Sequence, residues 1–203
     1  MKTLRQEIWA KIPSHVQVCA VTKGHSVKEM EALLQDLPHL QIIAENRWPD
    51  CEEKFQKFIN LKRHFIGRIQ KNKLNKILPL VDVIQSVDSL ELLKLISQKT
   101  TKPLEFTFQV NISNDPAKQG IAPENIRQII KESQKLPNVK LIGLMTIGDL
   151  QNQEKYFQEF KKLFDKLNSE FPKMPILSMG TSEDFELAIN CGATMVRLGS
   201  CLF

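Results

Sequence analysis

Short apolar segments alternate with longer amphipathic ones along the whole chain. The apolar segments are rich in Val, Ile and Phe and only a few residues long, which is typical of strands buried in a parallel sheet. The predicted strands are Val16–Val21, Leu40–Ala44, His64–Gly67, Val81–Ser86, Leu104–Val110, Lys140–Met145, Ile176–Met179 and Thr194–Leu198.

The amphipathic segments between them have the periodicity of helices. After a short helix near Thr3–Lys11, helices are predicted at Val27–Leu37, Pro49–Asn60, Ile69–Leu78, Ser89–Gln98, Pro123–Gln134, Gln153–Phe171 and Glu183–Cys191. Ser26 with Glu29, and Asp88 with Glu91, have capping-box spacing. Pro49 and Pro123 suit a first helical turn, because the amide that proline lacks would be unpaired there.

This alternation predicts an α/β fold with a parallel sheet. Right-handed crossovers allow either an open doubly wound sheet or a closed barrel. Eight strands close a barrel, and about 200 residues is the lower limit for one. We therefore predict that residues 1–203 form a single-domain (β/α)8 TIM barrel with a short extra N-terminal helix.

Charge is unevenly distributed along the chain. The net charge is +5, and the segment from Lys54 to Lys76 contains many lysines and arginines but no acid. Such a block could bind nucleic acid or a membrane surface. Its spacing also suits two solvated helix faces, which is the interpretation we favour, so a nucleic-acid partner is not predicted.

The cysteines and the N-terminus indicate a cytoplasmic protein. Cys19, Cys51, Cys191 and Cys201 show neither C-x-x-C pairing nor zinc-like spacing, so reduced thiols and no metal site are expected. No apolar run is long enough for a membrane span, and the first residues do not read as a signal peptide.

Polar, small or basic residues follow nearly every predicted strand. In such a barrel, reactive groups lie at the carboxyl ends of the strands, where the βα loops form an open mouth. The residues at these positions are Thr22–Gly24, Glu45–Asn46, His64 and Gly67–Arg68, Ser86, Asn111, Met145–Thr146, Ser178 with Gly180–Ser182, and Arg197 with Gly199–Ser200.

The last two loops are candidates for phosphate binding, as in many barrels. Gly180 and Gly199 let backbone amides approach a ligand closely. Thr181, Ser182 and Ser200 supply hydroxyl donors. Ser182 also stands at a predicted helix start, which favours an anion. Glu183 and Asp184 follow directly, and we expect both to point to solvent.

Lys23 is the candidate nucleophile. It follows the apolar segment that ends at Val21 and precedes Gly24, so its side chain is expected to project into the barrel mouth. Desolvation there would lower the pKa of the amine and make it reactive toward aldehydes. A lysine of this kind facing a phosphate pocket is the arrangement that pyridoxal 5'-phosphate needs.

Two other residues have competing interpretations. His64 lies inside a predicted strand, where a hydrogen-bonded core histidine is commoner than a catalytic one. Tyr156, the single tyrosine, lies on a long amphipathic helix beside Phe157 and Phe160, so packing is favoured over catalysis.

Nine ordered motifs carry a family resemblance. They are Ala20–Lys23, Glu45–Asn46, His64–Lys73, Ser86–Ser89, Gln109–Asn111, Lys118–Ile121, Gly143–Ile147, Leu177–Ser182 and Met195–Ser200. In these residues, from about Val18 to Phe203, the chain resembles the pyridoxal phosphate homeostasis proteins. That family consists of single-domain barrels akin to the N-terminal domain of alanine racemase, the fold type III of pyridoxal phosphate proteins.

The resemblance implies roles for individual residues. Lys23 would form the Schiff base with the cofactor. The phosphate cradle would comprise Thr181, Ser182, Gly199 and Ser200. Arg197 would face the pyridine nitrogen and leave it unprotonated, because a guanidinium keeps its proton. Asn46 and His64 would line the ring pocket.

The resemblance also implies a cofactor-binding protein that takes part in intracellular pyridoxal phosphate (vitamin B6) homeostasis without turnover. Pyridoxal phosphate-dependent apoenzymes would be its partners, and it would be a monomer. Related racemases use a second base, a tyrosine from an additional domain, and no counterpart of that tyrosine is expected here. The alternatives are a small racemase-like enzyme that uses Lys23, alone or with Tyr156, and a nucleic-acid-binding or docking protein that uses the Lys54–Lys76 block.

Overall fold

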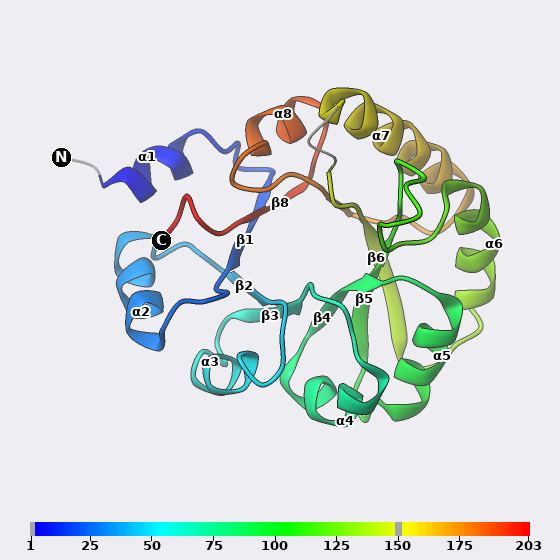
Figure 1. Cartoon of the computed structure of the whole chain (residues 1–203), viewed down its shortest axis with the longest axis horizontal. Helices are drawn as coiled ribbons and strands as arrows, with labels where there is room; N and C mark the ends of the chain where they lie inside the picture. Colours follow the sequence, from blue (N-terminus) through cyan, green and yellow to red (C-terminus); the bar gives the residue numbers. More distant parts are fainter. Residues whose placement is uncertain (1–2, 149–151) are drawn as a thin grey trace.

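The computed structural model describes residues 3–148 and 152–203. Eight parallel strands form a closed barrel in which each strand pairs with its sequence neighbours and β8 pairs with β1 (Figure 1). The strands are β1 (Gln17–Val21), β2 (Ile42–Glu45), β3 (Lys62–Phe65), β4 (Val83–Val87), β5 (Leu104–Gln109), β6 (Val139–Met145), β7 (Ile176–Ser178) and β8 (Met195–Leu198). The predicted (β/α)8 barrel is confirmed.

Helices surround this ring of strands, as Figure 1 shows. They are α1 (Leu4–Ala10), α2 (Val27–Asp36), α3 (Cys51–Lys57), α4 (Leu74–Ile77), α5 (Leu90–Lys99), α6 (Pro123–Ser133), α7 (Gln153–Glu170) and α8 (Phe185–Asn190), with short 3-10 helices η1 (Lys71–Lys73) and η2 (Leu78–Leu80). In the described part of the chain, no helix has the length and apolar character needed to cross a membrane.

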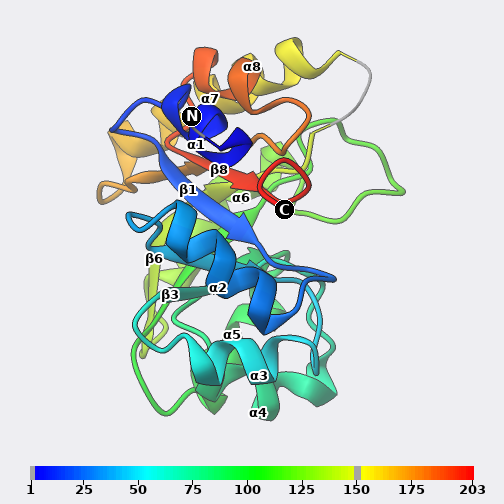
Figure 2. The same cartoon turned by 90° about the vertical axis from the view of Figure 1, so that its left-hand side faces the viewer.

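The extra N-terminal helix α1 is fastened to the C-terminal end of the chain. Arg5 on α1 pairs with Asp36 at 2.9 Å and donates through Nε to the carbonyl of Leu202 at 2.7 Å. Figures 1 and 2 both show α1 beside the C-terminus. This helix therefore covers the seam at which the first and last strands close the barrel.

The strand predictions agree with the structure to within two residues, but several helix boundaries were wrong. The segment Ile69–Leu78 is divided among η1, α4 and η2, and Pro79 lies inside η2, where proline removes an amide that a continuous helix would need. Pro49 does not begin α3, which starts at Cys51.

Capping was predicted correctly at one of two helices. Ser26 and Glu29 form the expected capping box of α2. At α5 the capping residue is Ser89, whose hydroxyl accepts from the Leu92 amide at 3.2 Å, and not Asp88 as predicted. Pro123 is the first residue of α6, as expected.

Two apolar clusters fill the fold. The larger lies between the barrel and its helices. The smaller lies inside the barrel and consists of Cys19, Ile42, Ala44, Val83, Ile142, Ile176 and Met195. These residues come from six strands and contact one another across the barrel axis, so the interior at this level is a packed core and no channel.

A buried ion pair ties α3 to the ends of β1 and β2. Glu45 is fully buried, and Lys54 on α3 is 7% exposed. Lys54 donates to Glu45 Oε1, and to the carbonyl oxygen of Thr22 at 2.6 Å. The Thr22 hydroxyl donates to the same carboxylate at 2.5 Å. The pair therefore fixes the backbone immediately before Lys23.

Replacing Lys54 by Met should destabilise the protein strongly, because the Glu45 carboxylate would stay buried without its cation. We expect a loss of about 3–5 kcal/mol in the free energy of unfolding, measured by urea denaturation. Lys57→Met is the matched control: Lys57 lies on the same helix in an exposed pair with Glu31, and its loss should cost about 1 kcal/mol or less. Equal losses in the two variants would contradict this.

Candidate functional site

The loops that follow β7 and β8 are joined at the barrel mouth, as the sequence predicts. The Ser182 hydroxyl oxygen accepts hydrogen bonds from the amides of Gly199 at 2.9 Å and Cys201 at 3.4 Å. Among the described residues its own hydroxyl hydrogen has no acceptor. Ser200 is exposed beside it. The structure thus brings together Ser182, Gly199 and Ser200. The hydroxyl groups of the two serines remain available to donate to a ligand.

The two loop glycines have different roles. Gly180 has φ +90°, and a Cβ there would lie 2.5 Å from the Ala188 Cβ, so the fold itself requires glycine. A Cβ on Gly199 would meet only ordinary contacts, the nearest being Val21 at 3.5 Å. The fold therefore leaves space at Gly199 that a ligand can use.

The expectation that Asp184 points to solvent is wrong. Asp184 is buried, and its carboxylate accepts from the Thr181 amide at 2.6 Å and from the Thr181 hydroxyl at 3.0 Å. The amide and hydroxyl donors of Thr181 are therefore both used to hold the loop. Glu183 is exposed, as expected. Helix α8 begins only at Phe185, so Ser182 does not stand at a helix start either.

Lys23 lies in the turn after β1, and its side chain is exposed. The expectation of a desolvated amine is therefore wrong for this structure. The reason is local: Thr22 takes the buried position at the end of the strand, and the chain then turns at Gly24, which has φ +79°. Because β1 pairs with β8 in the register Ala20–Leu198, the turn that carries Lys23 adjoins the loop at Gly199.

Arg197 is buried inside the barrel and is held by a residue of β7 and by the residue that follows β6. Its Nη1 donates to the Ser178 hydroxyl on β7 at 2.9 Å, and its Nη2 donates to the carbonyl of Thr146 at 2.9 Å. Burial lowers the pKa of the guanidinium from its ordinary value, and nearby Asp184 opposes that shift. Neither of these hydrogen-bond acceptors carries a charge.

A chain of hydrogen bonds continues from Arg197 across the barrel. The Ser178 hydroxyl donates to Gln85 Oε1 at 2.7 Å, and Gln85 Nε2 lies 2.8 Å from His64 Nδ1. Arginine only donates, so Ser178 must donate onward, and the Gln85 amide nitrogen must face His64. His64 Nδ1 is then an acceptor, which puts the ring proton on Nε2.

His64 is neutral in the folded protein. Burial lowers the pKa of its imidazole from 6.5 to about 3. Its buried Nε2 has no hydrogen-bond partner among the described residues. Beside the chain, burial raises the pKa of the Cys19 thiol to about 12, so this cysteine is an uncharged core residue. The interpretation of His64 as a hydrogen-bonded core residue fits the structure, and its free Nε2 leaves a role in ligand contact open.

Asn46 and Tyr156 complete the predicted set. Asn46 follows β2, is half-buried and packs against Gly67, where a Cβ would lie 1.9 Å from the Asn46 carbonyl oxygen. Its Oδ1 is buried without a partner among the described residues. Tyr156 is partly buried on α7 in the outer helix ring.

Sequence reasoning missed the roles of three residues at the site. Gln85 links Ser178 to His64, Asp184 turns inward to bind Thr181, and Lys54 pairs with Glu45. Gln85 is an amide within a strand that is buried along its whole length. That feature could have identified it, because a buried amide needs partners. The other two depend on contacts that no local pattern encodes.

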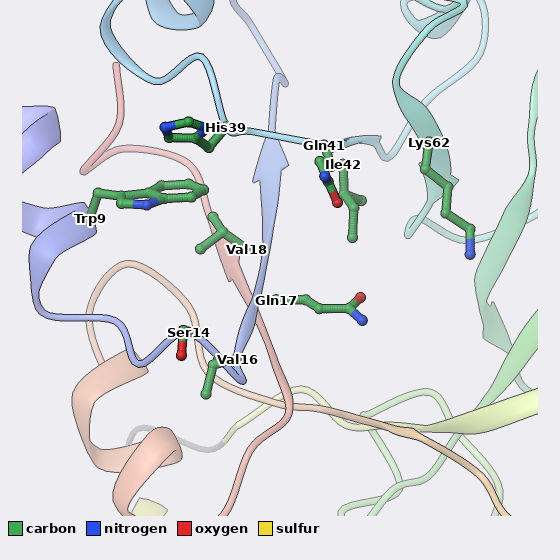
Figure 3. A pocket seen from close by; sticks show the side chains of 9 residues that line it. All are labelled: Trp9, Ser14, Val16, Gln17, Val18, His39, Gln41, Ile42 and Lys62. Carbon is green, nitrogen blue, oxygen red and sulfur yellow. The ribbon is translucent and has the colours of Figure 1, made fainter.

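A separate cavity of about 420 Å³ lies at the opposite end of the barrel. Its lining residues come from α1, from the segment before β1, and from the first residues of β1, β2 and β3, as Figure 3 shows. It is therefore remote from the loops that carry Lys23 and Ser182.

Comparison with known proteins places these features in a family. The alanine racemase N-terminal domain family matches residues 2–203. The pyridoxal phosphate homeostasis protein of Aquifex aeolicus is 38% identical over 81% of this chain and 76% of its own length. The protein of the same name from Haemophilus influenzae is 36% identical over 93% of this chain and 84% of its own length.

Solved structures have the same architecture. PipY of Synechococcus elongatus, solved without pyridoxal phosphate, superposes with a TM-score of 0.88 at 28% identity over 98% of both chains. PipY with pyridoxal phosphate bound gives a TM-score of 0.83 at 26% identity. Alanine racemase of Clostridium difficile, at 21% identity and a TM-score of 0.83, shares the fold over 55% of its chain.

The neutral His64 predicts a pH dependence of stability. Between pH 6.5 and about 3 the unfolded chain binds a proton at this residue and the folded protein does not, so stability falls as the pH drops through this window. Above pH 6.5 the residue contributes no pH dependence. We expect the wild type to lose about 1.4 kcal/mol per pH unit more than His64→Gln does in urea unfolding between those limits. Parallel curves for the two proteins would contradict a neutral buried histidine.

Proposed function

This chain belongs to the family of pyridoxal phosphate homeostasis proteins, whose barrel is that of the alanine racemase N-terminal domain, and from this premise we propose that it binds pyridoxal 5'-phosphate and serves intracellular homeostasis of that cofactor. The observation that carries the proposal is the junction of the loops after β7 and β8 through Ser182, next to the turn with Lys23. PipY, which has been solved with pyridoxal phosphate bound, supports it.

In this proposal Lys23 holds the cofactor as a Schiff base, and the loops after β7 and β8 hold its phosphate. The free Ser182 hydroxyl hydrogen, exposed Ser200 and the space at Gly199 support this assignment. Thr181 contributes by shaping the loop, since Asp184 already accepts from its amide and hydroxyl. The exposure of Lys23 leaves its amine accessible to an incoming aldehyde.

Arg197, His64 and Asn46 would surround the ring. The cofactor, when bound, supplies an aldehyde and an aromatic nitrogen that can withdraw electrons when protonated. Arg197 keeps its proton and has only uncharged hydrogen-bond partners, so it disfavours a second proton nearby. His64 Nε2 and Asn46 Oδ1 are polar atoms without partners among the described residues, which fits a polar ligand at this level of the barrel.

We propose further that residues 1–203 act as one domain, a cytoplasmic monomer without turnover that passes the cofactor to dependent apoenzymes. The position of Tyr156 supports the absence of turnover, because the tyrosine lies on the outer helix α7. The alternative, a small racemase-like enzyme, would need a second base opposite Lys23.

Borohydride reduction of the protein after incubation with pyridoxal phosphate should attach the cofactor to Lys23, because that lysine follows β1 at the mouth. Peptide mapping by mass spectrometry should find the label at Lys23, none after Lys23→Ala, and full labelling after Lys28→Ala, an exposed lysine on α2. A label on another lysine in the wild type would refute the assignment. Racemisation of free amino acids that disappears in Lys23→Ala would favour the enzyme alternative.

Gly199→Ala should weaken cofactor binding without unfolding the barrel. The added Cβ meets only ordinary contacts, so we expect the free energy of unfolding to change by less than about 1 kcal/mol while the dissociation constant for pyridoxal phosphate rises about tenfold. Gly180→Ala, with its positive φ and a 2.5 Å clash, should instead destabilise the fold. Absorbance titration and thermal unfolding measure the two effects. Unchanged affinity in Gly199→Ala would remove this loop from the site.

A further inference from the structure

A second pocket opens at the barrel mouth, between the loop after β2 and the loop after β3. Its volume is about 440 Å³. Asn46, Arg47 and Trp48 line it from the first loop, and Arg68 and Lys73 line it from the second. In the ring of eight strands β3 lies opposite β7, and no lining residue of this pocket comes from the loops that hold Ser182 and Gly199.

Three cations face this pocket without acidic partners. No acid is among its lining residues. Within residues 3–148 and 152–203, neither Arg47, Arg68 nor Lys73 forms an ion pair. Lys73 instead places its Nζ 4.7 Å from the centre of the Trp48 ring, a cation–π contact that holds the ammonium at the pocket.

Four cations of the Lys54–Lys76 block are neutralised within the fold. Lys54 pairs with Glu45, Lys57 with Glu31, Lys62 with Glu105, and Arg63 with Asp82. Of the block's other four cations, which form no ion pair within the described residues, Arg68 and Lys73 line the pocket, while Lys71 and Lys76 are exposed outside it. Bringing like charges together is unfavourable unless an anion joins them.

One lining residue also carries a polar donor that lacks a partner. Trp48 Nε1 is buried and has no hydrogen-bond partner among the described residues. An unpaired buried polar atom costs stability, so such atoms commonly mark the place of a ligand or ordered water. The indole N–H is a donor only, which suits an anion's oxygen.

We propose that this pocket binds a small phosphate-bearing anion, at a site separate from the Ser182–Gly199 loops. Two guanidinium groups and an ammonium supply the charge, and arginine forks match phosphate oxygens in pairs. The charges converge on one pocket, which favours a small molecule. A nucleic-acid strand would need a longer basic groove that follows its backbone. Lys73 lies over one face of the Trp48 ring, so that face is not free to stack on a base.

The test is calorimetric titration of inorganic pyrophosphate into the full chain, before and after borohydride-fixed loading with pyridoxal phosphate. The double variant Arg68→Gln/Lys73→Gln removes two pocket cations. The double variant Lys71→Gln/Lys76→Gln is its control, because both residues are exposed, belong to the same basic block and do not line the pocket.

We expect saturable binding of one pyrophosphate per chain, weakened about tenfold or more in the pocket variant and changed less than about twofold in the control. Binding should persist in the loaded protein. Loss of binding on loading, equal weakening in both variants, or no saturable binding would each overturn the proposal. So would tighter binding of a single-stranded oligonucleotide that both variants weaken alike, since that would indicate a basic surface.

Two further measurements keep this result separate from the cofactor assignment. Thermal unfolding checks that the pocket variant folds, and the single variant Arg68→Gln, at an exposed position, replaces it if it does not. Peptide mapping at Lys23 should be unchanged in the pocket variant. Absence of label at Lys23 in every protein would refute the cofactor proposal and leave the pyrophosphate result to stand alone.

Discussion

The polar interior of the barrel depends on one buried cation, Arg197. A charge removed from water must be hydrogen-bonded, and here two strands provide the acceptors, Ser178 and the Thr146 carbonyl. Because arginine only donates, it sets the direction of every hydrogen bond that follows, through Gln85 to His64. The tautomer of His64 follows from that direction, and its low pKa follows from burial.

The requirement that a buried charge be paired or hydrogen-bonded also explains how the barrel mouth is built. Glu45 is buried at the end of β2 and is acceptable there only because Lys54 reaches it from α3. Lys54 also holds the Thr22 carbonyl, so the residue before Lys23 is fixed while Lys23 itself remains exposed. Asp184 has a comparable role in the loop after β7, because its carboxylate accepts a hydrogen bond from the Thr181 amide and so closes that loop. Charged side chains thus set the shape of the loops, and hydroxyl and amide groups are left to meet a ligand.

Much of this architecture is predictable from local pattern, and its exceptions have physical causes. Strand positions follow from buried apolar runs, so they were predicted closely. The helix predicted after β3 was not, since periodicity does not show that this segment divides into η1, α4 and η2. Gly180, Ser182 and Gly199 were identified because their order along the chain and the barrel geometry suffice. The exposure of Lys23 and the inward carboxylate of Asp184 depend on which neighbour takes the buried position, and only the folded chain decides that.

The two sides of the barrel mouth differ in the charge of their side chains. On the β7–β8 side, burial lowers the pKa of Arg197, and the carboxylate of Asp184, which holds the loop through Thr181, partly opposes that shift. A phosphate there must be held mainly by neutral donors such as hydroxyls and amides. On the β2–β3 side, three cations line the pocket without an ion pair to any described residue. A neutral cradle selects a ligand by shape and holds it with little dependence on salt, while an uncompensated basic pocket attracts anions of many shapes and binds them more weakly as salt increases. The barrel therefore combines one selective and one permissive anion-binding region, and their chemistry differs because their charge balance does.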